Sequence, residues 1–468
     1  MSGATEPAIK SYFFGKGYSD LRNTIVDCWQ LNWASAEHFF NSARSTNFFY
    51  GAGWIAAGIS VVVFGTAFFL IVSALHIAII FLVHALFYLA FTITYLAERA
   101  YLLWRKIAVV CPRCHKKCSL PDYYCSKCSS VHRQLIPSSY GIFHHQCKCG
   151  EKLPSTFFAN RRRLQASCKG CELLLTPEQT EARKLFVHIV GGPSVGKTCY
   201  FFALMWKLVE EKLPQLGLGH RFVEPRDQNF YERIRKSIRQ GRAPGKTVEK
   251  LPPAFNLLIT RKDGENRLLY IYDPAGEAFA DLREMVLHKY QEYASGCIFL
   301  IDPFSISSIK EDYQTQLPAV LDALRPGSSS LEDTLSYFIL SLEEHYNLAK
   351  TDHIHFPLAV VINKIDAFDL EVRIGNTMVK DLAKTGDQPL GIADVRNDFL
   401  RQQLESWGYG GLVQRLESRF TKVRYFTCSS IGRLPDASGR QFEPYDVLEP
   451  LLWIFHESDR GFLADSAS

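Results

Sequence analysis

The stretch that decides the fold is Gly-Gly-Pro-Ser-Val-Gly-Lys-Thr at residues 191–198, which fits the pattern G-x-x-x-x-G-K-[ST]. An apolar run at residues 185–190 predicts a buried strand before it, and residues 199–213 predict a helix after it. In that context the glycines let backbone N–H groups close around a phosphate, beside the positive end of the helix dipole. The alternative is a glycine-rich turn with a chance lysine, and two later motifs argue against it.

This loop predicts most of a nucleotide site. We expect Lys197 to reach the β- and γ-phosphates and the Thr198 hydroxyl to bind Mg²⁺. The other contacts are expected from the rest of the loop and the start of the helix, namely Gly191, Gly192, Pro193, Ser194, Val195, Gly196 and Cys199.

Two strands predicted downstream place a carboxylate near that site. Residues 255–260 and 268–272 indicate paired strands joined by a turn at Asp263-Gly264. The second strand runs into Asp273-Pro274-Ala275-Gly276, where Asp273 suits a water-mediated contact with Mg²⁺ and the Gly276 N–H can meet the γ-phosphate. A plain Asp-Pro turn is the alternative. Thr247, in the polar loop at residues 217–253, is the threonine expected to sense the γ-phosphate and Mg²⁺.

A third motif, Asn363-Lys364-Ile365-Asp366, follows an apolar strand predicted at residues 358–362. GxxxxGKT, DxxG and NKxD in this order, each at a strand end, resemble the P-loop GTPases of the translation-factor and Ras-like (TRAFAC) class. The resemblance implies an α/β domain over residues 182–468, a mostly parallel sheet with helices on both faces, which binds GTP or GDP with Mg²⁺.

The resemblance also implies how the base is read. Asp366 would pair with the guanine ring N1 and the exocyclic amine, while Asn363 and Lys364 would brace the loop and cover the base. Ser429 and Ser430, after a strand predicted at residues 423–426, would belong to the last base-contacting loop.

One departure from the family concerns the expected catalytic set, which is Lys197, Thr198, Gly276 and Glu277. Ras-like enzymes carry a glutamine where this chain has Glu277, and a carboxylate adds negative charge near the γ-phosphate. We therefore expect slow turnover unless a protein partner or self-association accelerates it. The long segments at residues 305–356 and 367–422 are expected to be partner surfaces, with simple surface elaboration an equal alternative.

Residues 51–97 contain no Asp, Glu, Lys or Arg and are rich in Val, Ile, Leu and Phe, which indicates a membrane segment. Since one span needs about 20 residues, the run predicts a transmembrane hairpin over residues 51–98 with a turn near residues 73–76. Basic residues follow the run closely, so we expect its C-terminal side, and residues 1–50 as well, to lie in the cytoplasm. His76 and His84 lie inside the run and are expected to be neutral rather than functional.

Eight cysteines form four close pairs between residues 111 and 171. Their order predicts two structural zinc sites, about two Zn²⁺ ions, in a first zinc-ribbon-like module at residues 105–135 and a second at 140–176. The first site would use Cys111, Cys114, Cys125 and Cys128, and the second Cys147, Cys149, Cys168 and Cys171. Cys118, His115, His144 and His145 are alternative ligands. Reduced thiolates favour a cytosolic location for these modules.

The formal charge of +5 over 468 residues does not by itself indicate a nucleic-acid partner. Arg161, Arg162 and Arg163 form a basic cluster that could bind nucleic acid or acidic lipid, although a solvated surface is the simpler interpretation.

The membrane hairpin, the cysteine pairs and a GTPase with Tyr-Asp-Pro-Ala-Gly-Glu at residues 272–277 together resemble the bacterial double-GTPase type 2 group. That group is predicted to act in defence or conflict systems. The sequence thus predicts a membrane-anchored GTPase switch with an unidentified protein effector or activator. The alternatives are a scaffold that binds GTP without hydrolysing it and a membrane-tethered nucleic-acid sensor.

Overall fold

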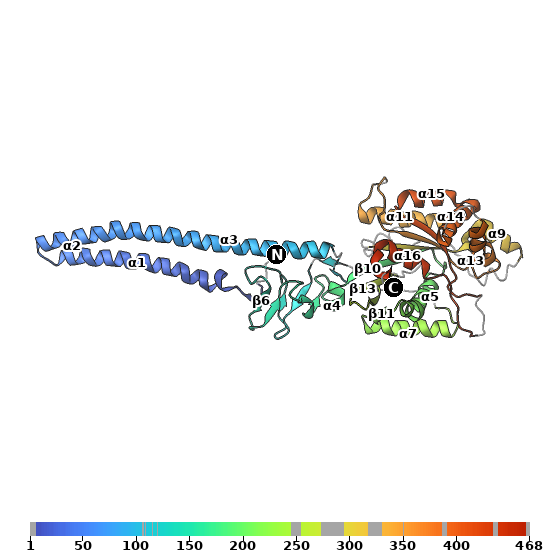
Figure 1. Cartoon of the computed structure of the whole chain (residues 1–468), viewed down its shortest axis with the longest axis horizontal. Coiled ribbons are helices and arrows are strands. Elements are labelled where there is room, and N and C mark those ends of the chain that lie inside the picture. Colours follow the sequence, from blue (N-terminus) through green and yellow to red (C-terminus); the bar gives the residue numbers. More distant parts are fainter. Residues whose placement is uncertain are drawn as a thin grey trace. The chain divides into compact units, whose positions relative to one another are not determined.

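The computed structural model describes residues 6–104, 107, 109–114, 116–118, 120–244, 254–272, 294–316, 330–349, 351–385, 391–433 and 439–464. The chain divides into two compact units, one of residues 1–109 and 118–180, the other of residues 110–117 and 181–468 (Figure 1). Each unit is considered separately.

A sheet of seven described strands forms the centre of the second unit, in the order β11-β12-β13-β10-β14-β15-β16. Strand β10 pairs in parallel with both β13 and β14, and β15 and β16 continue in parallel, whereas β12 and β11 are antiparallel. The strands span Arg183–Val190 (β10), Gly219–Phe222 (β11), Phe255–Thr260 (β12), Asn266–Tyr272 (β13), Gly296–Ile301 (β14), Leu358–Ile362 (β15) and Val423–Thr427 (β16). Since the predicted β12–β13 hairpin is present and most pairs are parallel, the predicted α/β class is confirmed.

Helices cover both faces of this sheet because its strands are apolar on both sides. Side chains of β10 alternate between two cores: Val187 and Ile189 face one, and Val190 faces the other. The first core is closed by α5 (Lys197–Lys207), α7 (Pro225–Arg239) and α16 (Glu449–Ser458). The second is closed by α9 (Ser307–Gln316), α11 (Leu331–Tyr346), α14 (Ile392–Leu404) and α15 (Gly410–Arg419), which come from the two long segments noted in the sequence.

The first unit contains an antiparallel helical hairpin. Helix α1 (Lys16–Arg44) is followed, after a short turn, by α2 (Phe48–Ser60), a π-helical turn η2 (Val61–Gly65) and α3 (Thr66–Trp104). The last three form one continuous helix of 57 residues, Phe48–Trp104, which is long and apolar enough to cross a membrane by length and composition.

Small residues let α1 approach this long helix closely. Gly51, Gly58 and Gly65 recur every seven residues, and a side chain at any of them would press on Ala43, Phe40 or Asn32 of α1. A seven-residue repeat keeps one stripe of a helix facing its partner, and glycine brings the two backbones together. The contact continues to Ser73, whose hydroxyl accepts a hydrogen bond from Nε1 of Trp29 at 3.0 Å.

The turn predicted near residues 73–76 is wrong, because α3 is helical throughout that stretch. Residues 73–76 contain neither glycine nor proline, so nothing in their backbone favours a break. The chain reverses instead between α1 and α2, at residues 45–47, and a pair of spans within residues 51–98 is not confirmed.

Short antiparallel strands, here called the cysteine-bearing strands, lie next to the paired cysteines in the chain. One sheet has the order β5-β4-β8-β9, so residues from the two predicted ribbon modules pair within one sheet. Its strands are Asp122–Tyr124 (β4), Val131–His132 (β5), Ala166–Ser167 (β8) and Leu174–Leu175 (β9). A second sheet joins β6 (His144–Cys147) and β7 (Lys152–Pro154) to β1 (Ala8–Ile9), the strand that precedes α1.

The segment between β7 and β8 contacts the end of α3. Glu98 of α3 accepts a hydrogen bond from Nη2 of Arg161 at 2.7 Å and another from the Phe157 N–H at 3.2 Å, and both charged side chains are about 5% exposed. Arg161 also donates to the carbonyl oxygens of Leu135 and Ser155. Because Arg161 is buried in this way, the predicted cluster of three arginines is not one exposed basic surface.

Candidate functional site

The candidate site lies at the carboxyl ends of the parallel strands of the second unit. The strand order reverses at β10, since the chain continues to β13 on one side and β14 on the other. Loops that leave adjacent strands in opposite directions open a crevice at such a point, where ligands bind in open α/β sheets. The phosphate loop follows β10 and the Asn363-Lys364-Ile365-Asp366 motif follows β15, so the topology brings these two motifs to one edge.

The backbone of the phosphate loop requires its glycines. Gly196 has φ +90° and forms the N-cap of α5, and a side chain there would lie 2.8 Å from Nδ2 of Asn363. Gly191 is packed against Leu300 of β14, where a side chain would lie 2.9 Å from the carbonyl oxygen. The loop is thus fixed against the two strands that flank the site.

Lys197 is the first residue of α5 and is almost fully buried. Its Nζ donates to the carbonyl oxygens of Gly191 at 2.8 Å and Gly192 at 2.9 Å, so the ammonium group lies within the curve of the loop. A cation held there can balance the negative charge of a phosphate, so the predicted contact of Lys197 with phosphate stays a prediction. Thr198 and Cys199 follow in the first helical turn.

The NKxD motif is bonded directly to the phosphate loop. Asn363 is buried and donates from Nδ2 to the Val195 carbonyl at 3.2 Å, while Lys364 donates from Nζ to the Ser194 carbonyl at 3.1 Å. Phosphate-binding and base-reading loops, separated by more than 160 residues, therefore form one hydrogen-bonded site. This relation is what a shared nucleotide requires.

The loop after β16 orients the residues predicted to read guanine. Ser429 donates its hydroxyl hydrogen bond to the Asp366 carboxylate and accepts one from the Gly432 N–H. Ser430 donates to Oδ1 of Asn363 at 2.8 Å. Burial raises the pKa of Asp366, and the Ser429 hydroxyl and Lys364 oppose that shift.

Asp302 is a site residue that sequence reasoning missed. It follows β14, is fully buried, and accepts a hydrogen bond from Nζ of Lys364 at 2.7 Å and one from the Phe304 N–H at 3.0 Å. The sequence did contain a signal, because Asp302 is a carboxylate at a strand end, the same feature that singled out Asp273.

A comparison with protein families agrees with these features of the site. Residues 185–405 match the Double-GTPase 2 family. The predicted resemblance is confirmed for this part of the chain, and the family indicates a GTPase that binds guanine nucleotide. A comparison with curated proteins finds no match for the chain.

Part of the predicted GTPase site lies outside the described residues. Thr247, Asp273, Gly276 and Glu277 are in this group, so their predicted contacts stay predictions.

A partly buried polar network adjoins the base-reading loop of the GTPase domain. Tyr445 donates to Glu371 at 2.9 Å, and Arg396 donates to Oδ1 of Asn376 at 2.6 Å and pairs with Glu449. Burial raises the pKa of Glu371 and lowers that of Arg396. Since Tyr445 also exchanges backbone hydrogen bonds with Ser429, helices from residues 370–404 connect to the loop that holds Asp366.

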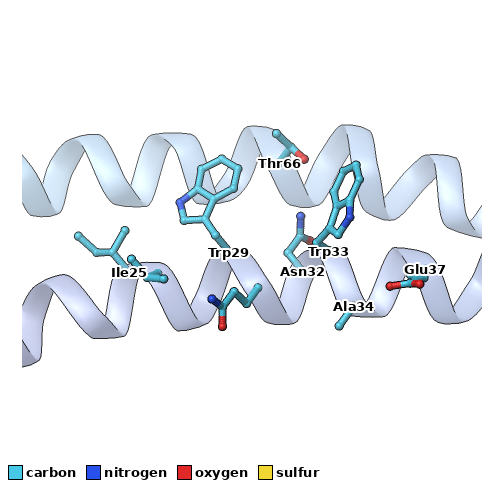
Figure 2. Close-up of a pocket in the computed structure, with 9 residues that line it drawn as sticks. Ile25, Trp29, Asn32, Trp33, Ala34, Glu37 and Thr66 are labelled. Carbon is cyan, nitrogen blue, oxygen red and sulfur yellow. The ribbon is translucent and has the colours of Figure 1, made fainter.

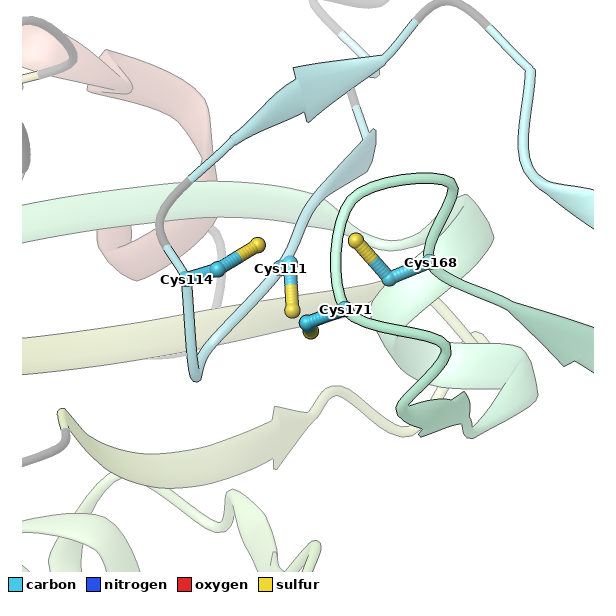
Figure 3. A group of neighbouring side chains, drawn as sticks. All are labelled: Cys111, Cys114, Cys168 and Cys171. Carbon is cyan, nitrogen blue, oxygen red and sulfur yellow. The ribbon is translucent and has the colours of Figure 1, made fainter.

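Eight of the cysteines form two groups of four. Within each group, the four sulfur atoms lie within 4.8 Å of one another. One comprises Cys125, Cys128, Cys147 and Cys149. The other comprises Cys111, Cys114, Cys168 and Cys171, which Figure 3 shows gathered around a common point. The two groups contain all eight cysteines predicted as ligands, but the predicted division between the first four and the last four is wrong.

Antiparallel pairing of β4 with β8 keeps Cys125 and Cys168 apart. Asp122 pairs with Ser167 and Tyr123 with Ala166, so Cys125 and Cys168 follow their strands at opposite ends of the ladder. They cannot share one ion. Cys147 and Cys149 lie with Cys125 and Cys128, whereas Cys168 and Cys171 lie with Cys111 and Cys114.

The geometry of the group at residues 125–149 fits a zinc ion. Sulfur atoms of Cys125 and Cys149, and those of Cys128 and Cys147, are 3.6 Å apart. Zinc–sulfur bonds of about 2.3 Å in a tetrahedron place sulfur atoms about 3.8 Å apart, whereas a disulfide needs about 2.0 Å. Hydrogen bonds from Ser130 lower the pKa of Cys128 to about 6, whereas burial raises that of Cys147 to about 12. A dication would compensate the buried thiolate.

The alternative ligands are accounted for where they are described. The buried His145 ring lies with Nε2 2.8 Å from the Ile136 carbonyl, so it is committed to the backbone. Cys118 and His144 belong to neither group, and His115 lies outside the described residues.

Proposed function

We propose that this chain is a membrane-attached GTPase switch, which binds Mg²⁺-GTP, hydrolyses it slowly to GDP and phosphate, and signals the difference to a protein partner. The observation that carries the proposal is the direct bonding of Asn363 and Lys364 to the phosphate loop, together with Ser429 on Asp366. A carboxylate held at that position accepts two N–H groups from guanine, which adenine does not offer in the same pattern.

Each predicted site residue would have its own role in binding or hydrolysing GTP. Lys197 would bind the β- and γ-phosphates, and Thr198 with Asp273 would hold Mg²⁺, which neutralises phosphate charge when bound. Gly276 would contact the γ-phosphate, Thr247 would sense it, and Glu277 would accept a hydrogen bond from water. Because Glu277 is anionic, we expect that activation needs a partner.

The membrane attachment rests on the helix Phe48–Trp104, and the zinc-binding strands lie between it and the GTPase domain in the chain. We propose that these strands are a structural adaptor and that the GTPase domain is cytoplasmic. The resemblance to the double-GTPase group supports a place in a bacterial defence system.

A second candidate is a scaffold that binds GTP but barely hydrolyses it, which the glutamate at position 277 favours. Nucleic-acid sensing is less favoured because Arg161 is buried against Glu98.

The deciding experiment measures the affinity of the full chain for GTP, GDP and ATP in Mg²⁺. We expect both guanine nucleotides to bind more tightly than ATP, and Lys197→Ala and Asp366→Asn to weaken them. Equal binding of ATP would overturn the guanine assignment. Single-turnover hydrolysis then separates switch from scaffold, since a scaffold leaves GTP intact after binding.

A further inference from the structure

The helical hairpin has two chemically different sides. Side chains that point away from α1 on the long helix are apolar and exposed, as at Phe49, Ile71 and Ile93. Most side chains that point away from the long helix on α1 are polar and exposed, although Leu31 is exposed there too. The polar ones include Lys16, Asn23, Asp27, Gln30, Glu37 and Asn41. The hairpin is therefore amphipathic in cross-section, with one helix forming each side.

The boundary between the two sides carries aromatic and apolar groups. At 100° per residue, Val26 and Trp33 lie roughly 100° from the centre of the packed face of α1. Figure 2 shows Trp29 and Trp33 rising from α1 beside Thr66 of α3, where they line a groove of about 660 Å³. Tryptophan prefers the level of the lipid headgroups, where an apolar ring and a polar N–H are both satisfied.

The length of the long helix limits the orientations that the hairpin can adopt in a membrane. The continuous helix has 57 residues, which is about 85 Å at 1.5 Å per residue, against a hydrocarbon core of about 30 Å. An upright helix would leave much of its apolar surface in water. It would also carry α1 into the hydrocarbon, because α1 contacts the long helix from Gly51 to His84.

Charge counts against the upright arrangement too. Helix α1 carries Asp20, Arg22, Asp27 and Glu37 between its ends, and all four are exposed in the hairpin. Charged side chains are strongly disfavoured near the bilayer centre, where no water hydrates them. In the plane of the surface the same four groups lie in water or among headgroups.

We propose that the hairpin lies in the plane of a bilayer surface, with the apolar side of the long helix immersed and α1 covering it from the water. This inference rests on the membrane attachment proposed above and adds its orientation. Helices of this kind immerse one face to about 5–10 Å. The hydrocarbon then surrounds the apolar side chains along the whole long helix, which water would solvate poorly.

The depth of three positions tests this orientation directly. A genetically encoded fluorophore is placed at Phe49, Ile71 or Ile93 in the full chain bound to phosphatidylcholine–phosphatidylglycerol vesicles, and quenched by labelled lipids of known depth. We expect one shallow depth at all three positions and no quenching by iodide trapped inside the vesicles. Depths that differ among the three positions, or quenching of position 49 by iodide in the vesicle lumen, would overturn the proposal. The hairpin would then span the bilayer, either alone or in an assembly of several copies.

A matched pair of variants gives an independent measurement. Ile71 and Gln30 lie at nearly the same level of the hairpin, since Trp29 contacts Ser73, but on opposite sides. We expect Ile71→Asp to reduce vesicle binding at least about tenfold and Gln30→Asp to change it less than about twofold. Equal losses would contradict the in-plane orientation, because both sites would then lie in hydrocarbon. If the unaltered chain does not bind vesicles at all, the membrane attachment itself fails, and that result is distinct from a wrong orientation.

Discussion

Lys364 of the base-reading motif and Asp302 at the end of β14 form a contact of 2.7 Å, with the Asp302 carboxylate fully buried. The same ammonium group reaches the Ser194 carbonyl in the phosphate loop. A buried carboxylate therefore holds the lysine across the site, between the loop that would bind phosphates and the loop that would read the base. This relationship links strand β14 to guanine binding.

Replacing Asp302 should weaken nucleotide binding. Asp302→Ala removes the partner of Lys364 and leaves its charge poorly compensated, a loss of about 1.5–3 kcal/mol for a hydrogen bond to a charged group. We expect GTP affinity to fall roughly 10- to 100-fold by calorimetry. The control is Asp312→Ala, which removes an exposed carboxylate from α9 and should have little effect. Unchanged GTP affinity in a folded Asp302→Ala protein would exclude this positioning role.

Ser429 should control how long guanine nucleotide stays bound. Its hydroxyl orients Asp366, so Ser429→Ala removes one hydrogen bond to a carboxylate in a buried setting. We expect GDP dissociation, measured by stopped-flow release of a fluorescent analogue, to accelerate roughly tenfold. The exposed Ser418 in α15 offers a control, because Ser418→Ala leaves the base loop untouched. Equal release rates in the two variants would count against an orienting role.

Zinc stoichiometry should report which cysteines share an ion. The double variant Cys125→Ser with Cys147→Ser removes two ligands of one observed group, so we expect about one zinc per chain to remain. The predicted division by chain order would instead cost both ions. Elemental analysis of the purified full chain distinguishes the outcomes.

The complementary variant sharpens that measurement. Cys111→Ser with Cys125→Ser removes one ligand from each observed group and should lose both ions, whereas Cys118→Ser should lose none. Circular dichroism shows whether the variants keep their fold, since metal binding is coupled to folding in small zinc modules.

Breaking the buried pair of Glu98 and Arg161 should destabilise the first unit. Glu98→Ala leaves the guanidinium buried without its carboxylate, which costs about 3–5 kcal/mol in the free energy of unfolding. Denaturant unfolding monitored by zinc release should show the loss. Asp381→Ala breaks an exposed pair with Lys384 and should cost less than about 1 kcal/mol. Comparable effects would mean that Glu98 is solvated in the protein.

Asp227 should make the stability of the second unit depend on pH. Burial raises its pKa to about 6. Because the folded state holds this proton more tightly than the unfolded chain, its stabilising contribution is present below about pH 4 and is lost as pH rises towards 6. We expect Asp227→Asn to flatten that decline and to be about 1–3 kcal/mol more stable at pH 7.

Urea unfolding of the full chain at pH 4.5 and 7 measures the effect. The control is Asp398→Asn, at an exposed position of α14. A pH dependence that is the same in Asp227→Asn and in the unaltered chain would show that burial of this carboxyl is not its source.

Local patterns predicted the GTPase domain well. Residues 191–196 lie between a strand and a helix as their spacing required, and Asp263-Gly264 joins two antiparallel strands. These features depend on neighbours within a few residues, so propensity and turn chemistry are enough. Asp302 escaped notice because its role depends on Lys364, which is 62 residues away.

The partner of the long helix and the grouping of the cysteines could not be predicted from local sequence patterns. The apolar composition of residues 51–97 was plain, but the turn at residues 73–76 was inferred from length alone, and the partner of the long helix proved to be α1. Four C-x2-C-like pairs can be joined in several ways, and their spacing does not choose among them.

The sequence by itself determined the GTPase motifs, the eight paired cysteines and the apolar character of one long segment, because each is a property of residue type and close spacing. Only the tertiary structure decided which thiols share an ion, which residue holds Lys364, and that a polar helix covers the apolar one. Those relations come from strand pairing and from packing between segments distant in the chain, and they depend on the whole fold rather than on any one stretch.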